Sequence, residues 1–216
     1  MNNIEAAAAA RKTRSEAHLA HAKLPIDPTL PPLSPELSAL ARTPEEIAAR
    51  AICLCICAAR AEGLEQQVAV SLTHDLGVAQ HLRPRESDFL NAQADPGIEG
   101  RLFQWGYEAC WVLLWVLGRI ERLDDPVAMC DPQRVAAIIT TAKSIERLIG
   151  TCRSDGDILD AADLTWRFLG ICRQAVPSYQ NAPGGVICQV VAQRQYAFQW
   201  LLDPARQPWE DIVVDI

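Results

Sequence analysis

Four aspartates are the side chains whose spacing comes closest to a reactive site. They are Asp155, Asp157, Asp160 and Asp163. Asp160 and Asp163 lie three residues apart, so on a helix they would share a face and, together with Glu108, could hold a metal ion. A calcium loop of the EF-hand type, however, needs a glycine at its sixth position and a glutamate at its twelfth, and residues 155–157 do not provide that order.

A capped and ion-paired helix accounts for the same acids without a metal. Asp155 and Asp157 would fall in the first turn of a helix, where the helix dipole favours negative charge. Asp163 stands four residues before Arg167, a spacing that favours an ion pair. We therefore predict no metal site.

Cysteines are the second group with chemical potential. The eight are Cys53, Cys55, Cys57, Cys110, Cys130, Cys152, Cys172 and Cys188. Most lie within apolar helical patterns, which indicates buried thiols. On a helix Cys53 and Cys57 would share a face while Cys55 points away, and no histidine is near enough to complete a zinc site. Residues 1–23 lack the apolar run of a signal peptide, so we expect a cytoplasmic protein rather than a secreted disulfide framework.

The histidines and the paired glycines add no catalytic group. The four histidines, none of them near a serine or cysteine in a recognised nucleophile context, are His18, His21, His74 and His81. Gly184-Gly185 precedes a helical segment, but no Lys-Ser or Lys-Thr follows as in a phosphate-binding loop. We predict no catalytic residue and no cofactor.

The helix that must position everything else is the apolar run at residues 109–117. It has no polar face, which is typical of a helix packed on all sides, and it is about half as long as a membrane span requires. Glu108 stands at its edge, and a buried carboxylate needs a partner. We predict a structural network in which Glu108 pairs with an arginine, and the candidates are Arg153, Arg167 and Arg194.

Capping signals and proline and glycine breaks divide the chain into seven or eight helices. The main ones are expected at about residues 44–62, 64–76, 85–91, 99–122, 132–149, 155–175 and 186–202. The fold class predicted is all-α: a single compact domain, residues 40–216, around a central buried helix, with a short extended C-terminal tail. Residues 1–39 would form an Ala-rich helix and a Pro-rich strap that ends near Pro35, and the fold should not need them.

The charge of the chain restricts its partners. The net charge is −7, and residues 24–216 carry 16 basic against 25 acidic residues, or −9. Nonspecific binding to nucleic acid or to an anionic membrane needs a basic face, so we expect neither. An acidic body suits a basic protein partner instead.

Four segments together resemble a bacterial family known only as a domain of unknown function. They are residues 42–51 (RTPEEIAARA), the core at 105–118 (WGYE to LWVLG), 157–167 (DILDAADLTWR), and 194–201 followed by Trp209-Glu210-Asp211. The chain departs from the pattern at Gln199, where Asn is expected, at Ile216, where the family tends to end in Thr, and in its Ala-rich and Pro-rich head. The resemblance implies a helical fold and offers no catalytic residues.

These observations favour a non-enzymatic binding protein, similar in size, acidity and lack of catalytic signature to immunity proteins that neutralise a toxin, here of the nuclease type. The candidate contacts are Asp124, Asp125, Asp155 and Asp157. Two alternatives stay open: a hydrolase or small-molecule binder that uses interior carboxylates and tryptophans, and a scaffold subunit.

Overall fold

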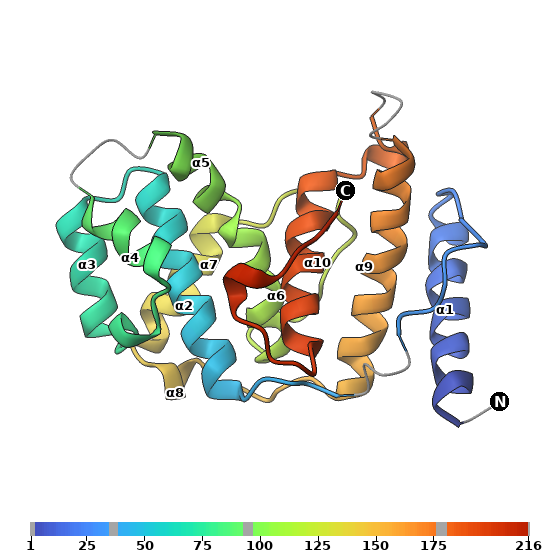
Figure 1. Ribbon diagram of the computed structural model, residues 1–216, viewed down its shortest axis with the longest axis horizontal. Coiled ribbons are helices and arrows are strands. Elements are labelled where there is room, and N and C mark those ends of the chain that lie inside the picture. Colours follow the sequence, from blue (N-terminus) through green and yellow to red (C-terminus); the bar gives the residue numbers. More distant parts are fainter. Residues whose placement is uncertain (1–2, 35–38, 93–96, 176–180, 216) are drawn as a thin grey trace. The chain divides into compact units, whose positions relative to one another are not determined.

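The computed structural model describes residues 3–34, 39–92, 97–175 and 181–215, and every regular element in these residues is helical (Figure 1). The predicted all-α class is confirmed. Pro35 and Ile216, which the sequence analysis placed in the strap and the tail, lie outside the described residues. Within the described part, no helix is both long enough and apolar enough to cross a membrane.

The contacts of the chain group into two compact units. Unit 1 comprises Met1–Ala41, Leu123–Met129 and Arg153–Ile216, and unit 2 comprises Arg42–Arg122 and Cys130–Cys152. The chain therefore passes from unit 2 into unit 1 for one short segment and then returns.

Unit 2 is organised around two buried helices, α2 (Pro44–Ala61) and α6 (Gly106–Val116). Every residue of α6 is buried, which confirms the predicted central helix, and α2 is buried without interruption from Ile47 to Ala58. Alanines and cysteines fill much of that stretch, and these small side chains let the two helices pack closely. At the contact, a side chain on Gly106 would begin 3.4 Å from the carbonyl oxygen of Leu54.

Shorter helices of unit 2 surround this pair. They are α3 (Gln66–Asp75), the 3-10 turn η1 (Ala79–His81), α4 (Pro84–Asn91), α5 (Gly97–Gln104), α7 (Pro132–Ala142) and α8 (Ile145–Leu148). A capping box begins α2: Thr43 Oγ1 accepts from the Glu46 N–H at 3.2 Å, and Glu46 Oε2 accepts from the Thr43 N–H at 2.8 Å. All six elements contact α2.

Two of the predicted long helices are interrupted. The helix expected at residues 99–122 breaks at Trp105 and ends at Val116, because Gly118 turns with φ 73° and lies against Thr151, whose carbonyl oxygen a side chain there would meet at 2.1 Å. The helix expected at 132–149 divides at Lys143, which has φ 62°. A residue in the left-handed region is a common helix C-terminus.

In the described residues of unit 1, the long helix α9 (Asp155–Ala175) packs between α1 (Asn3–His21) and α10 (Cys188–Leu202) (Figure 1). The 3-10 turn η3 (Pro183–Gly185) precedes α10. A buried apolar cluster joins these elements: Leu19, Leu24, Phe168, Leu169, Ile171, Cys172, Val186 and Val191.

The Pro-rich strap is fastened to α9 by hydrogen bonds. Arg167 donates to the carbonyl oxygens of Leu30 at 2.8 Å and Pro31 at 2.5 Å, and Asp163 Oδ1 accepts from the Leu33 N–H at 3.1 Å. These contacts give residues 24–33 a fixed place in unit 1. Whether the fold needs this segment stays a prediction.

The C-terminal segment packs along α10. Trp209 begins the 3-10 turn η4 (Trp209–Asp211), and its ring centroid lies 4.9 Å from that of Tyr196 and 5.3 Å from that of Trp200. Ile212 is also buried, whereas Val213 is 71% exposed. The tail therefore docks through Trp209 and Ile212.

Candidate functional site

The segment Leu123–Met129, here called the acidic loop, combines a fixed backbone with exposed acidic and apolar side chains. Arg194 donates to the Asp124 carbonyl oxygen at 2.6 Å, and the Ile187 N–H donates to the Pro126 carbonyl oxygen at 2.8 Å. His18 Nε2 lies 2.8 Å from Asp125 Oδ1. Contacts from α1 and from the region of α10 thus hold the loop in place, as a scaffold holds a binding loop.

The outer side of this loop faces solvent. Val127 is 50% exposed and Met129 is 59% exposed. Asp124 is exposed too, and among the described residues its carboxylate has no hydrogen bond or ion pair. Apolar side chains beside a solvated carboxylate are typical of a protein–protein contact surface, with its apolar centre and polar rim.

Behind the loop lies a hollow of about 40 Å³, which the loop shares with α9 and α10. Its lining includes Asp124, Asp125, Ala161, Phe168 and Arg194. Sites for organic ligands measure roughly 300–1,000 Å³. This hollow is too small for such a ligand, so what the loop offers is its outer surface.

The other two predicted contact residues, Asp155 and Asp157, lie in the first turn of α9. Asp155 Oδ1 accepts from the Leu40 N–H at 3.1 Å, and Asp157 Oδ2 accepts from the Ser154 hydroxyl at 2.7 Å. Both side chains are exposed. Both aspartates add negative charge to unit 1 and also hold local structure through these hydrogen bonds. The Asp124 carboxylate, in contrast, makes no such hydrogen bond to the described residues. Their part in binding a partner stays a prediction.

The remaining aspartates of the α9 group hold unit 1 together. Asp160 forms ion pairs with Arg11 at 3.3 Å and Arg14 at 2.6 Å, both on α1. Asp163 is buried with Arg167 at 3.1 Å, which confirms the ion pair expected from their spacing. In the described residues, no group of three or more histidines, cysteines or acids is arranged to hold a metal ion.

The predicted structural network falls in both units. Glu108 belongs to unit 2, where its Oε1 accepts from the Cys130 N–H at 2.5 Å. Arg153, Arg167 and Arg194 belong to unit 1. Arg167 is committed to Asp163 and the strap, and Arg194 donates to the acidic loop. The pairing of Glu108 with an arginine stays a prediction.

A buried ion pair that the sequence analysis missed lies in unit 2. Arg50 and Glu86 are both buried, 2.5 Å apart, and Glu86 Oε2 also accepts from the Arg83 N–H at 2.9 Å. Burial is the strongest single influence on Arg50 and lowers its pKa, but the charge of Glu86, the charges of Cys53 and Cys57 and the hydrogen bond to Glu86 together outweigh burial and leave that pKa above its ordinary value. The sequence contains a signal that could have revealed this pair: Arg50 has apolar residues on both sides in the chain. A buried helix tolerates such an arginine only when it has a partner.

The cysteines are only partly the buried thiols that were expected. Cys53, Cys55, Cys57 and Cys110 are buried free thiols in unit 2, and Cys130 and Cys152 are partly buried free thiols. Cys172 of α9 and Cys188 of α10, in contrast, form a disulfide. For this pair the expectation of thiols was wrong. The two residues lie 16 apart in sequence, and the packing of α9 on α10 is what brings them together.

In the described residues the chain is an all-helical protein whose acids cap helices, fasten segments or face solvent. It belongs to the family described as a domain of unknown function (DUF4272), whose model matches residues 11–212. The match begins within α1, so residues 11–39 of the head lie within the family's domain, and for these residues the expectation that the family pattern lacks the head was wrong. No curated protein and no solved structure matches the chain.

Proposed function

We propose that this protein is a non-enzymatic binding protein of the immunity type, which neutralises a basic toxin through the acidic surface of unit 1. The observation that carries the proposal is the acidic loop. Its backbone carbonyl groups accept hydrogen bonds from Arg194 and from the Ile187 N–H, while Asp124, Val127 and Met129 are exposed to solvent.

The distribution of charge supports unit 1 as the binding unit. Unit 1 carries nine basic and fourteen acidic residues, a net charge of −5, whereas unit 2 carries eleven and thirteen, a net charge of −2. Complementary charge speeds the encounter of two proteins, and a desolvated apolar centre provides most of the affinity. The loop offers both features within a few residues.

A nuclease toxin is the partner that fits this chemistry best. Proteins that grip nucleic acid carry clustered positive charge on the surface that contacts phosphate. An acidic cover over that surface would block substrate access without any reaction of its own. We propose the cytoplasm as the location, because a toxin that degrades nucleic acid acts there.

The test is co-expression with toxins encoded beside this gene, followed by measurement of the dissociation constant at low and moderate salt. The triple variant Asp124→Ala, Val127→Ala, Met129→Ala should weaken binding by about thirtyfold, as expected for a contact centre worth about 2 kcal/mol. A matched triple variant in unit 2 replaces three other exposed residues by alanine: Asp88, Val68 and Leu102.

The matched variant should bind as the unmodified protein does, and binding should weaken as salt rises. Equal affinities of the two triple variants would remove the acidic loop from the proposal. Failure to bind or protect against every neighbour-encoded toxin, or metal-dependent turnover by the purified protein, would overturn the immunity function itself.

A further inference from the structure

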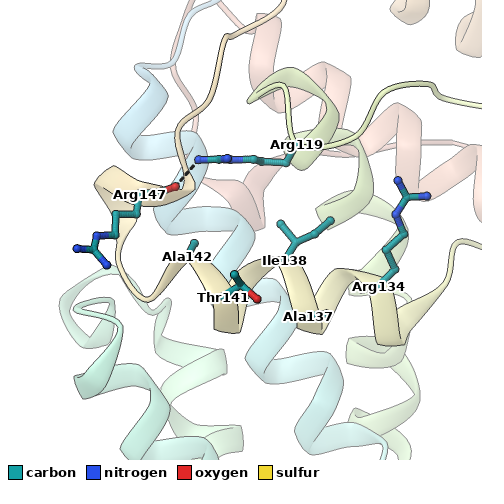
Figure 2. A pocket seen from close by; sticks show the side chains of 7 residues that line it. All are labelled: Arg119, Arg134, Ala137, Ile138, Thr141, Ala142 and Arg147. Atoms are coloured by element: carbon teal, nitrogen blue, oxygen red, sulfur yellow. Dashed lines mark hydrogen bonds between the residues drawn. The ribbon is translucent and has the colours of Figure 1, made fainter.

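A second surface feature, on unit 2, has the opposite charge. A hollow of about 510 Å³ lies along one face of α7 (Figure 2). Its lining consists of Arg119, Arg134, Ala137, Ile138, Thr141, Ala142 and Arg147. The α7 residues recur at helical spacing on the side of the helix that does not hold the buried Val135 and Ile139.

Among the residues that the structure describes, no acidic side chain lines this hollow, although three arginines do. The nearest acid before Arg134 in sequence is Asp131, whose carboxylate caps α7 by accepting from the Gln133 and Arg134 N–H groups. In the described part of the chain, the guanidinium of Arg134 has no hydrogen bond or ion pair. It lies over the buried ring of Trp111, 5.4 Å from the ring centroid.

Arg119 is held in position at the other side of the hollow. Its Nε donates to the Leu148 carbonyl oxygen at 2.9 Å, and its Nη2 donates to those of Ile149, at 3.0 Å, and Arg147. Within the described residues its Nη1 has no partner. The backbone of α8 thus fixes a guanidinium that still has two N–H donors to offer.

Figure 2 shows how these groups are placed. Arg119 and Arg134 stand on two sides of Ile138, and the side chain of Arg147 points away from Ile138. The surface between the two arginines is therefore apolar. Thr141 adds a hydroxyl that makes no hydrogen bond to any described residue.

We propose that this hollow binds a small organic molecule that carries a phosphate or carboxylate group on an apolar body. Guanidinium groups match the planar geometry of such oxyanions, and a fixed Arg119 loses little freedom on binding. Ile138 and its alanine neighbours would cover the apolar body. The volume falls within the roughly 300–1,000 Å³ range of ligand sites.

The charge around the hollow favours a single small anion over nucleic acid. Three arginines around one hollow give far fewer phosphate contacts than the six to ten of a typical DNA-binding protein. The body as a whole is acidic and would repel a polyanion. This inference concerns unit 2 and does not depend on the function proposed for unit 1.

The experiment is an NMR titration of the full-length 15N-labelled protein with three probes at low salt: phenyl phosphate, benzoate and benzyl alcohol. Saturable shifts of the Trp111 indole and the α7 amides with phenyl phosphate or benzoate, but not with benzyl alcohol, are expected. The ratio of the two anion affinities tells whether phosphate or carboxylate is preferred.

The variant Arg134→Gln should weaken binding of the preferred anion by about tenfold or more, because it removes charged donors. Arg101→Gln, at an exposed arginine of unit 2 outside the hollow, is the matched control and should bind normally. Both variants are checked by thermal melting. Equal binding by the two variants, equal shifts with benzyl alcohol, or no saturable shift with either anion would overturn the proposal.

Discussion

At the scale of single residues, three buried carboxylates find partners of different kinds. Glu86 pairs with Arg50, and Asp163 pairs with Arg167. Glu108 accepts a backbone N–H from Cys130. A buried charge without such partners costs several kcal/mol, so each carboxylate restrains the segment that satisfies it. Glu108 thereby fastens the point where the chain re-enters unit 2.

Replacement of Glu108 tests this role. The side chain is 2% exposed. Glu108→Ala should lower the free energy of unfolding by about 1–3 kcal/mol if the carboxylate only accepts the Cys130 N–H. The loss should reach about 3–5 kcal/mol if it also pairs with a buried arginine. Urea unfolding followed by circular dichroism measures the difference.

Glu108→Gln separates the two roles, because glutamine keeps an acceptor oxygen and loses the charge. A mild effect of this variant indicates hydrogen bonding, and a loss as large as that of Glu108→Ala indicates a paired charge. A melting temperature unchanged in both variants would show that Glu108 is not structural.

At the scale of helices, the sequence predicts starts better than ends. Thr43-Pro44 and Asp131-Pro132 begin helices where local capping chemistry requires it. Gly118 and Lys143 end helices early because of positive φ. At Gly118 a further restraint, the close approach to Thr151, involves residues distant in sequence. Local patterns do not contain that information.

The head, residues 1–39, shows even more strongly that local sequence patterns do not reveal contacts with distant residues. Alanine-rich helices bury little by themselves, and prolines remove backbone donors, so the sequence indicates a dispensable segment. In the structure, Leu19 and Leu24 belong to the buried cluster of unit 1. The strap accepts from Arg167, a residue more than a hundred positions away. Only the folded arrangement reveals these partners.

Truncation tests whether the head is dispensable, as the sequence indicates, or stabilises unit 1, as its contacts indicate. A chain that begins at residue 40 should melt at a lower temperature and less cooperatively than the full chain. It loses three buried leucines, Leu19, Leu24 and Leu33, worth roughly 1.5–3 kcal/mol each. It also leaves Arg167 and Asp163 with fewer partners. Helical circular dichroism against temperature is the measurement.

A chain that begins at residue 6 is the matched control. It removes the exposed Ile4 and keeps the buried Ala8, so its melting should change little. An unchanged, cooperative transition in the longer truncation would support the sequence-based expectation of a dispensable head.

At the scale of the whole molecule, each unit presents one distinctive surface. Unit 1 offers an acidic loop with Val127 and Met129, and unit 2 offers a hollow edged by Arg119 and Arg134. The sequence predicted Asp124 and Asp125 as partner contacts, because charged side chains are usually exposed to solvent. It gave no sign of the exposed apolar pair beside them or of the hollow, since both depend on which side chains the fold leaves uncovered.

The buried thiols predict how the molecule responds to alkaline pH. Burial raises the pKa of Cys53 and of Cys55 from 9.0 to about 12, and burial raises the pKa of Cys57 and of Cys110 as well. Below pH 9 these thiols are protonated in both folded and unfolded chains. Above pH 9 the unfolded chain releases protons that the folded chain keeps.

The contribution of these thiols to the free energy of unfolding should therefore be constant up to about pH 9. Between pH 9 and 12 the free energy of unfolding should fall by at most about 1.4 kcal/mol per pH unit for each thiol. Guanidinium unfolding at several pH values gives the slope. Cys55→Ala should make the slope shallower. Val112→Ala, which also creates space in the core of unit 2 but removes no thiol, should lower stability and leave the slope unchanged. If both variants keep the slope of the unmodified protein, groups other than the buried thiols govern its alkaline stability.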